Sequence, residues 1–331
     1  MFSYLFAFSF FYYKPTMQIL SLPLVVIREI FANFKLEELL FLSFCSKRFK
    51  YLIQSLQGRR FKQIKIITYN FSVGNVCISA ETLFSLTLCE VNYGITQMGV
   101  WNPLHSTYEY DKKEKEYIIR GVHSYIQQFF GSSILYQVNS KNVLPISLEN
   151  IESSSIKCPE NTNPEELEAC FQNSPNQKTT IHLEGPLAGN ICSDSVIYKA
   201  DFLDVDCLRN RKESEILRHF KGKRLRCMNT SFSNSQVIEF LNAWKSGQMF
   251  KKSKLLGIHT NFDLNEDEIM GKVDHIKFNK RHGNKENTVA TTTGQYLIRE
   301  SDGQKGYLTI SQMSVHLAVF GKTGGHVNFD I

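Results

Sequence analysis

The sequence predicts an α+β protein with a small N-terminal module of three helices, a mixed α/β region with strand-helix repeats, and a C-terminal β-hairpin. Three observations predict this fold class. Apolar residues at helical spacing fill residues 19–53, strands and helices alternate after residue 180, and an Asp-Gly pair separates two apolar runs near the C-terminus. The 331 residues suffice for one large or two medium domains beyond the small module.

The N-terminal module is predicted from its apolar stripes. Leu22-Pro23 opens it, because proline suits the first turn of a helix, and Ser46 can cap the third helix. The apolar positions of the three helices are Ile27, Ile30, Phe31 and Phe34, then Leu36, Leu39, Leu40, Phe41 and Leu42, then Phe49, Leu52 and Ile53. So short a segment falls below the roughly 40 residues that usually fold unaided. Part of its apolar surface is therefore expected to belong to a partner.

The order of these positions, with Cys45 and Ser46-Lys47-Arg48 between them, resembles the F-box. This helical motif ties a substrate receptor to the Skp-type adaptor of a cullin ubiquitin ligase. The resemblance places the F-box at residues 17–57 and implies that seven residues carry its fold and its adaptor surface: Leu22, Pro23, Ile27, Ile30, Leu39, Leu42 and Phe49. Which of them face inward stays open, and a helical hairpin of an ordinary core is the alternative interpretation.

Residues 1–16 form an apolar N-terminal extension. Its apolar run is too short for a spanning helix and has neither a basic start nor a small-residue cleavage site. Met17 follows it, so a cryptic or disordered extension upstream of the true start is one interpretation. A tail packed on the receptor domain and a membrane or signal role are the others.

Composition indicates an ordinary folded protein, with 42% hydrophobic and 21% charged residues. The net charge of +6 is mildly basic, and short of what nucleic-acid-binding domains tend to show. The eight cysteines are far apart and form no Cys-x-x-Cys pair. This spread favours reduced thiols in a cytoplasmic or nuclear protein over a disulfide framework or a zinc site.

Residues 58–180 are predicted to be a strand-rich linker and the first part of a receptor domain. Alternation from Phe61 through Ile64 and Ile66 begins a series of short strands that runs to residue 88, and another strand starts at Leu135. The segment 111–130 switches to helical spacing. Residues 139–180 are expected to be loop, apart from a helix capped by Asn163 that runs to about residue 171.

Residues 181–331 are predicted to alternate strands and helices, which favours parallel pairing in an α/β layer. The expected strands are 180–183, 196–198, 223–229 and 255–258, and the expected helices are 214–220, 234–244 and 265–270. An antiparallel hairpin with its turn at Asp302-Gly303 is predicted to follow. Two strand-helix units also resemble a degenerate leucine-rich repeat, although a solenoid needs at least three.

This C-terminal third resembles the type 2 F-box-associated domain of a large nematode family of F-box proteins. The residues that carry the resemblance are the capped helix from Ser233 to Trp244, the strand after it, and the hairpin from Ile298-Arg299 to Asp302-Gly303. The family is inferred to recruit substrates, so the resemblance names an architecture and leaves the target open.

Catalytic and cofactor motifs are weak in this sequence. Gly321-Lys322-Thr323 is similar to the end of a P-loop, but His316 occupies the position of the first required glycine. No histidine or cysteine pattern has metal-ligand spacing. Asp201, Asp204 and Asp206 form an acidic cluster that is expected to flank a turn rather than to bind a cation. No catalytic, cofactor or metal site is predicted.

The predicted function is that of a non-catalytic substrate receptor. Its expected partners are a Skp-type adaptor, a cullin scaffold reached through that adaptor, and a protein substrate. Neither a membrane nor a nucleic acid is expected as a partner. The alternatives are an α/β enzyme whose pocket gathers His182, His259 and Asp201, and a weakly basic nucleic-acid-binding protein that uses Lys251 to Arg281.

Overall fold

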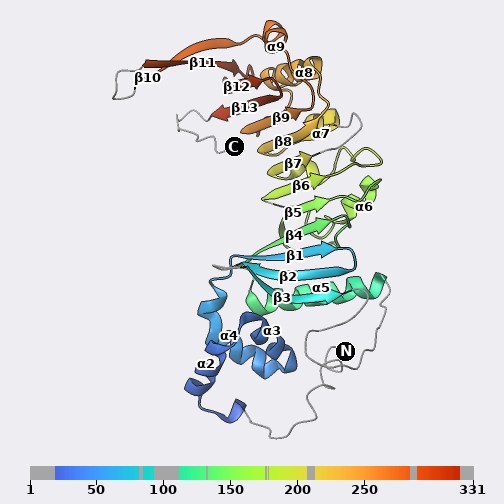
Figure 1. The fold of residues 1–331 in the computed structure, drawn as a ribbon, viewed down its shortest axis with the longest axis vertical. Helices are drawn as coiled ribbons and strands as arrows, with labels where there is room; N and C mark the ends of the chain where they lie inside the picture. Colours follow the sequence, from blue (N-terminus) through green and yellow to red (C-terminus); the bar gives the residue numbers. More distant parts are fainter. Residues whose placement is uncertain are drawn as a thin grey trace. The chain divides into compact units, whose positions relative to one another are not determined.

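The computed structural model describes residues 19–81, 85–92, 112–131, 133–175, 177, 179–206, 213–283 and 289–320. The chain divides into two compact units after Ile151, and Figure 1 shows their elements. The apolar extension at residues 1–16 and the Gly321-Lys322-Thr323 motif lie outside the described residues.

The first unit, over its described residues, combines helices with a four-stranded sheet. After a 3-10 turn (Ile19–Ser21), the helices are α2 (Leu24–Asn33), α3 (Leu36–Cys45), α4 (Lys47–Phe61) and α5 (Lys112–Phe130). The strands are β1 (Ile66–Ser72), β2 (Asn75–Glu81), β3 (Ser85–Asn92) and β4 (Leu135–Lys141), in the spatial order β3-β2-β1-β4. The β1–β4 pair is parallel and the other pairs are antiparallel. The predicted helix at 111–130 and strand at Leu135 are confirmed.

The boundary between α4 and β1 differs from the prediction. The third helix continues to Phe61, and the strand expected from Phe61 begins instead at Ile66. Helix α4 extends because the Phe61 ring packs on α5, with its centroid 5.1 Å from that of Phe129 and 5.0 Å from that of Phe130. A tertiary contact therefore overrides the local alternation.

The core of the first unit is shared by the N-terminal helices, the sheet and α5. It includes Phe31 of α2, Leu40 of α3, Ile53 of α4, Ile67 of β1 and Ile126 of α5, all fully buried. Because these residues form one cluster, the three N-terminal helices share their core with the sheet and α5. They depend on residues that follow them by up to about a hundred positions.

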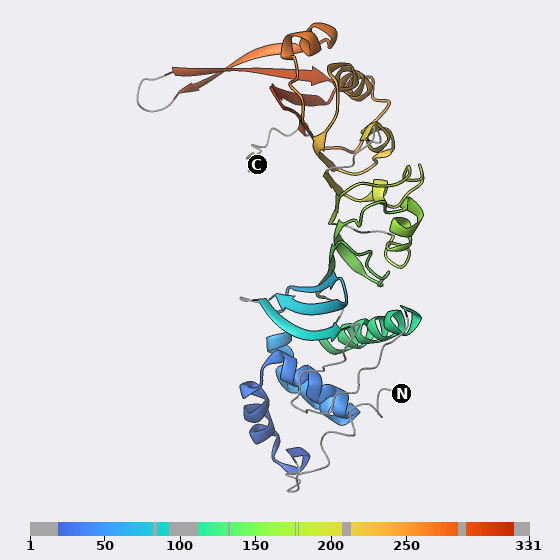
Figure 2. The same cartoon turned by 45° about the vertical axis from the view of Figure 1, so that its right-hand side comes forward.

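The second unit contains a long sheet with helices on one face, as Figures 1 and 2 show for α6, α7 and α8. The helices are α6 (Pro164–Ala169), α7 (Glu213–His219), α8 (Asn234–Lys245) and α9 (Glu266–Lys272), with a 3-10 turn η2 (Ile197–Lys199). The first strands are β5 (Ile151–Lys157), β6 (Thr180–Glu184), β7 (Phe202–Asp206), β8 (Arg224–Thr230) and β9 (Leu255–Thr260). The last strands are β10 (Ile276–Gly283), β11 (Val289–Ile298), β12 (Lys305–Ser311) and β13 (Ser314–Phe320).

The strand order in this sheet is β5-β6-β7-β8-β9-β13-β12-β11-β10. Strands β5 to β9 pair in parallel, and the remaining strands pair antiparallel. The predicted parallel α/β layer and the antiparallel end are therefore confirmed. The parallel part contains more strand-to-strand connections than the two strand-helix repeats that the sequence pattern indicated.

Helix α8 shows why this layer forms. The Ser233 hydroxyl accepts a hydrogen bond from the Gln236 backbone N–H at 3.4 Å, so the helix is capped as predicted. Its apolar stripe, which includes Phe240 and Trp244, is buried. Gly306 lies under this stripe, where a Cβ atom would come within 2.8 Å of the Trp244 ring. A glycine on β12 thus makes room for the indole.

Two expected assignments in this unit are wrong. Residues 196–198 were expected to be a strand, but Ile197–Lys199 is the turn η2 and the strand is β7, Phe202–Asp206. The acidic cluster was expected to flank a turn, yet Asp204 and Asp206 lie within β7. Leu203 and Val205 point into the core while the acids point away, so period-2 alternation is present. The strand has only two buried apolar residues, so its alternation is hard to recognise in a sequence segment rich in aspartate.

Strand β5 also replaces an expected loop. Its serine triplet, Ser153 to Ser155, is typical of a polar linker. However, Ser154 is buried and pairs with Ile181 of β6, and Ile156 beside it in the strand is fully buried. A serine thus occupies a buried position of this strand, so polarity alone misidentified the segment.

The C-terminal hairpin is confirmed and is held by a buried arginine. Arg299, 1% exposed, donates from Nε to Asp302 Oδ1 at 3.0 Å and from Nη1 to the Phe250 carbonyl oxygen at 3.2 Å. Its guanidinium lies 5.3 Å from the Trp244 ring centroid. Gly303 has φ of +68°, as the predicted turn requires.

Candidate adaptor-binding surface

Helices α3 and α4 begin with capping hydrogen bonds, whereas α2 begins after a proline that makes no side-chain capping bond. Pro23 precedes the first helical residue of α2. The Glu38 carboxylate accepts a hydrogen bond from the Lys35 backbone N–H at 2.7 Å at the start of α3. The Ser46 hydroxyl accepts from the Phe49 backbone N–H at 3.2 Å, which confirms the predicted cap of α4.

Arg60 joins the end of α4 to the end of α2. Its guanidinium donates to the carbonyl oxygens of Phe31 at 3.0 Å and of Phe34 at 2.9 Å. Both carbonyls lie at the C-terminal end of α2, where helix carbonyl groups lack their usual i+4 donors, and the Phe31 carbonyl also accepts a hydrogen bond from the Phe34 backbone N–H at 3.3 Å. Arg60 therefore fixes the angle between the two helices, a role that the sequence pattern did not reveal.

The face of α3 and α4 toward the sheet is anchored on α5. The rings of Phe44 and Tyr125 stack at a centroid distance of 4.3 Å. The Gln54 side-chain amide donates to the carbonyl oxygens of Gln128 and Phe129, at 2.8 and 3.0 Å, and so satisfies the C-terminal end of α5. Lys50 lies 4.4 Å from the Tyr125 ring centroid, and burial lowers its pKa. Part of the apolar surface that was expected to belong to a partner is therefore covered by the chain itself.

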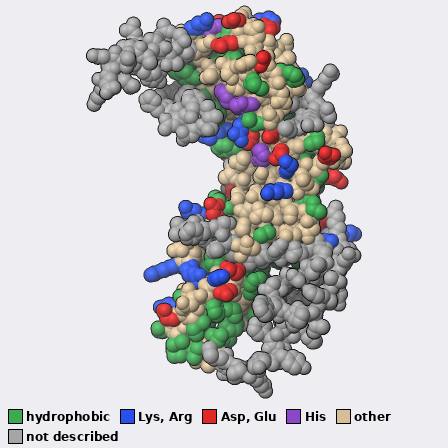
Figure 3. Space-filling model, in the orientation of Figure 1, with side chains coloured by type: hydrophobic (Ala, Val, Ile, Leu, Met, Phe, Trp, Pro, Cys, Tyr) green, Lys and Arg blue, Asp and Glu red, His purple; other side chains and the backbone are tan. Residues whose placement is uncertain are grey.

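The opposite surface of these helices remains exposed and apolar. Leu24, Val25 and Val26 in the first turn of α2 are 60%, 67% and 42% exposed, and Tyr51 of α4 is 69% exposed. Figure 3 shows apolar side chains gathered over this end of the chain. A shallow depression lined by Arg48, Tyr51, Leu52 and Ser55 lies on α4. Consecutive exposed apolar residues of this size are typical of a protein-binding surface.

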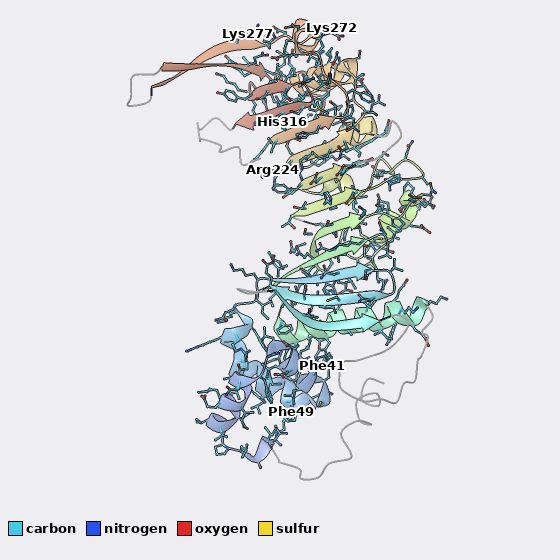
Figure 4. All side chains as sticks on the ribbon, viewed as in Figure 1. Phe41, Phe49, Arg224, Lys272, Lys277 and His316 are labelled. Carbon is cyan, nitrogen blue, oxygen red and sulfur yellow. The ribbon has the colours of Figure 1, made fainter. Side chains whose placement is uncertain are left out.

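The seven residues implied by the F-box resemblance occupy different depths. Ile27 and Leu39 are buried, at 2% and 0% exposed, and belong to the core. Pro23 is exposed. Leu22, Ile30, Leu42 and Phe49 are half-buried and pack against that core. Figure 4 labels Phe49 on α4, whose ring centroid lies 6.4 Å from that of Phe31, together with Phe41 on α3.

Sequence reasoning missed the most exposed apolar residues of the module. Leu24, Val25, Val26 and Tyr51 do not lie on the apolar stripe that predicted the helices. A signal was present, because Leu22 to Ile27 is an unbroken apolar run, wider than one helical face. Such a run leaves part of itself outside the core.

The acids and histidines considered for a catalytic pocket or a cation site pair with their neighbours in the second unit. Asp201 forms a salt bridge with Lys223, and Asp206 accepts a hydrogen bond from the Asn229 amide at 2.6 Å. Asp204 lies 3.1 Å from His182 Nδ1 and pairs with Arg226. Burial raises the pKa of Asp204, but the hydrogen bonds from His182 and Arg226 outweigh burial and bring the pKa to about 2. His259 lies beside His316 instead, with ring centroids 4.9 Å apart.

Two further features of the described residues bear on the site. No group of three or more His, Cys, Asp or Glu side chains lies close enough to hold a metal ion in the described ranges. No helix among the described residues combines the length and the apolar character that crossing a bilayer requires.

Comparison with protein families identifies an F-box domain at residues 19–61. This range covers α2, α3 and α4 and the 3-10 turn before them, and it ends at the last residue of α4. The exposed residues of α2 and α4 and the seven residues considered above all lie inside it. Comparison with curated proteins and with solved structures gave no match.

Proposed function

From the F-box domain at residues 19–61, we propose that the chain is a substrate-receptor subunit of a cullin-type ubiquitin ligase. The F-box would dock on a Skp-type adaptor, and the rest of the chain would hold a protein target. The observation that carries this proposal is the exposed apolar surface of Leu24, Val25, Val26 and Tyr51 inside the matched domain.

The proposed mechanism is proximity. A receptor that binds adaptor and target together raises the effective concentration of target lysines near the ubiquitin-charged enzyme. No reacting group on the receptor is needed for this task. The second unit, residues 152–331, is the proposed target-binding part, as a type 2 F-box-associated domain would be.

The adaptor interface is proposed to combine the exposed residues with the accessible part of Leu22, Pro23, Ile30, Leu42 and Phe49. Ile27 and Leu39 would support it from the core. Tyrosine is enriched among the residues that dominate binding free energies, so Tyr51 is the most informative position, and Val25, 67% exposed, is the most exposed of the three apolar residues that open α2.

Co-purification of the full chain with a Skp-type adaptor of the same organism tests the proposal. Val25→Asp and Tyr51→Ala are expected to abolish or strongly reduce capture. The matched controls are Val73→Asp and Tyr117→Ala in the same unit, which alter residues that are 78% and 74% exposed outside the F-box. Controls that lose capture as fully as the F-box variants, or a wild-type chain without capture, would refute the proposal.

A further inference from the structure

The face of the second sheet opposite α6, α7 and α8 carries a row of residues that are polar except at Gly257. Strand register aligns His182 with Asp204, Asp204 with Arg226, Arg226 with Gly257, and Gly257 with His316. The alternate residues of these strands, such as Leu203, Leu225 and Leu256, are buried against the helices. No described helix lies over the row in Figures 1 and 2.

Acidic residues are distributed unevenly along this sheet. Strands β6 and β7 carry Glu184, Asp204 and Asp206. The six strands that follow in space, β8, β9, β13, β12, β11 and β10, contain 45 residues and no Asp or Glu. With 32 acids in 331 residues, about four would be expected in 45 residues. This half of the sheet therefore has basic and neutral side chains without opposing carboxylates of its own.

The basic groups at the centre of this region differ in how far they are neutralised. Arg226 donates hydrogen bonds from Nε and from Nη2 to the two carboxylate oxygens of Asp204 on the neighbouring strand. Arg224 is exposed and lies over the Phe202 ring, 4.6 Å from its centroid. It forms no salt bridge with any described residue. Stacking on Phe202 restrains the guanidinium of this exposed residue.

Two histidines extend this region across the next strands. The His259 and His316 rings meet at 4.9 Å, and the His316 ring lies against Gly257, where a Cβ atom would come 3.2 Å from Nδ1. Burial lowers the pKa of both histidines. They are therefore largely neutral at pH 7 and offer hydrogen-bonding groups beside Arg226, which aligns with Gly257 and His316, while Arg224 lies two residues before Arg226 on the same face of β8. Figure 4 marks Arg224 on β8 and His316 on β13, and Figure 3 shows basic and histidine side chains on this face.

We propose that the face formed by Arg224, Arg226, His259 and His316 binds an acidic, extended segment of the recruited protein. A carboxylate of the segment would pair with Arg224, and its backbone and polar groups would contact the two histidines. Neighbouring strands lie about 4.8 Å apart, so the distance from β8 across β9 to β13 is about 10 Å. This distance matches the length of about three residues of an extended chain. This inference rests on the proposed function, because it assigns the chemistry of the recruited target.

The charge distribution favours a peptide over a nucleic acid. Arg226 already has a carboxylate partner, and the two histidines are mostly uncharged. A phosphate backbone that continued across β7 and β6 would meet Asp204, Asp206 and Glu184. A short acidic peptide can pair with the free arginine and end before these residues. Nucleic-acid binding usually needs a longer basic track.

Binding of labelled octapeptides to the full chain tests this proposal. An array of peptides with four glutamates each is compared with the same peptides carrying glutamine, at physiological salt. Selective binding of the glutamate peptides is expected, and Arg224→Gln should weaken it about tenfold, the effect of one charge-assisted hydrogen bond. Lys272→Gln, which removes one positive charge from the exposed face of α9, is the matched control and should not weaken it.

Three outcomes would overturn the proposal: no preference for glutamate over glutamine, equal weakening by the two variants, or tighter binding of a labelled 20-nucleotide single strand than of any peptide. Adaptor capture is measured on the same proteins. Arg224→Gln should retain it. Glutamate-peptide binding without adaptor capture would refute the ligase function alone, whereas capture without peptide binding would refute the acidic-segment site alone.

Discussion

The Tyr125 hydroxyl donates a hydrogen bond to the Ser43 carbonyl oxygen at 2.7 Å, and so joins α5 to α3 across 82 residues of sequence. The same hydroxyl lies 2.9 Å from Ser43 Oγ. Ser43 is 2% exposed, so its carbonyl has little access to water. The F-box helices are thus tied to the sheet unit by a polar contact as well as by apolar packing.

Tyr125→Phe should destabilise the first unit by about 1–3 kcal/mol, because it leaves the Ser43 carbonyl without this donor. The ring remains, so stacking on Phe44 is retained. The free energy of unfolding in urea measures the effect. Tyr117→Phe on the exposed face of the same helix is the control and should change it by less than about 0.5 kcal/mol. Equal effects of the two substitutions would contradict the assigned role of the Tyr125 hydroxyl.

Arg60→Met should destabilise the F-box helices by about 1–3 kcal/mol, since the Phe31 and Phe34 carbonyls lose a charged donor. Methionine keeps much of the apolar stem and the helix propensity. Arg59→Met changes an exposed neighbour on the same helix and should have little effect. Thermal unfolding of both variants, followed by circular dichroism, provides the comparison. A stable Arg60→Met protein would show that water replaces the guanidinium at these carbonyls.

Gly247→Ala should destabilise the second unit more than Gly303→Ala. Both glycines have positive φ, +72° and +68°, so each substitution carries a backbone cost of about 1–2 kcal/mol. At Gly247 a Cβ would also come 2.3 Å from Ser301 Oγ, whereas at Gly303 it would meet nothing within 4 Å. Denaturant unfolding of the two variants separates the steric cost from the backbone cost. Identical losses of stability would mean that Ser301 moves aside freely.

Asp204→Asn should reduce stability most between about pH 4 and 6.5. The hydrogen bond to Asp204 raises the His182 pKa above 6.5, so its contribution is complete below that value and is lost as the pH rises through the folded pKa. The Asp204 pKa is lowered from 3.8 to about 2, so its contribution is complete above 3.8 and is lost as the pH falls toward 2.

Unfolding free energies of the wild type and Asp204→Asn, measured from pH 3 to 9, check this window. The difference between the two proteins should shrink at both ends, more strongly on the acidic side, because Arg226 still pairs with Asp204 at high pH. An NMR titration should show a lower His182 pKa in the variant. A difference in stability that is independent of pH would exclude the ionised pair as its source.

The sequence determined the elements whose signals are local. Caps at Ser46, Asn163, Ser233 and Asn265 and the Asp302-Gly303 turn act within a few residues of themselves, so their positions can be read along the chain. The spacing of about ten residues was sufficient to predict the F-box, which the family comparison confirms at residues 19–61. Strands β5 and β7 were not predicted because their inward-facing residues are few or polar. Pairing with neighbouring strands decides the conformation of these two segments.

Tertiary structure decided which apolar residues of the F-box remain exposed. Helical periodicity marks Ile27 and Leu39 as strongly as it marks Ile30 and Phe49, yet the first two are buried. Exposure of Val25 and Tyr51 depends on where α5, more than fifty residues further along, covers the helices. The polar row from His182 to His316 likewise exists because strand register aligns residues that are far apart in sequence. Burial and register depend on contacts between distant segments, and a local pattern holds no record of those contacts.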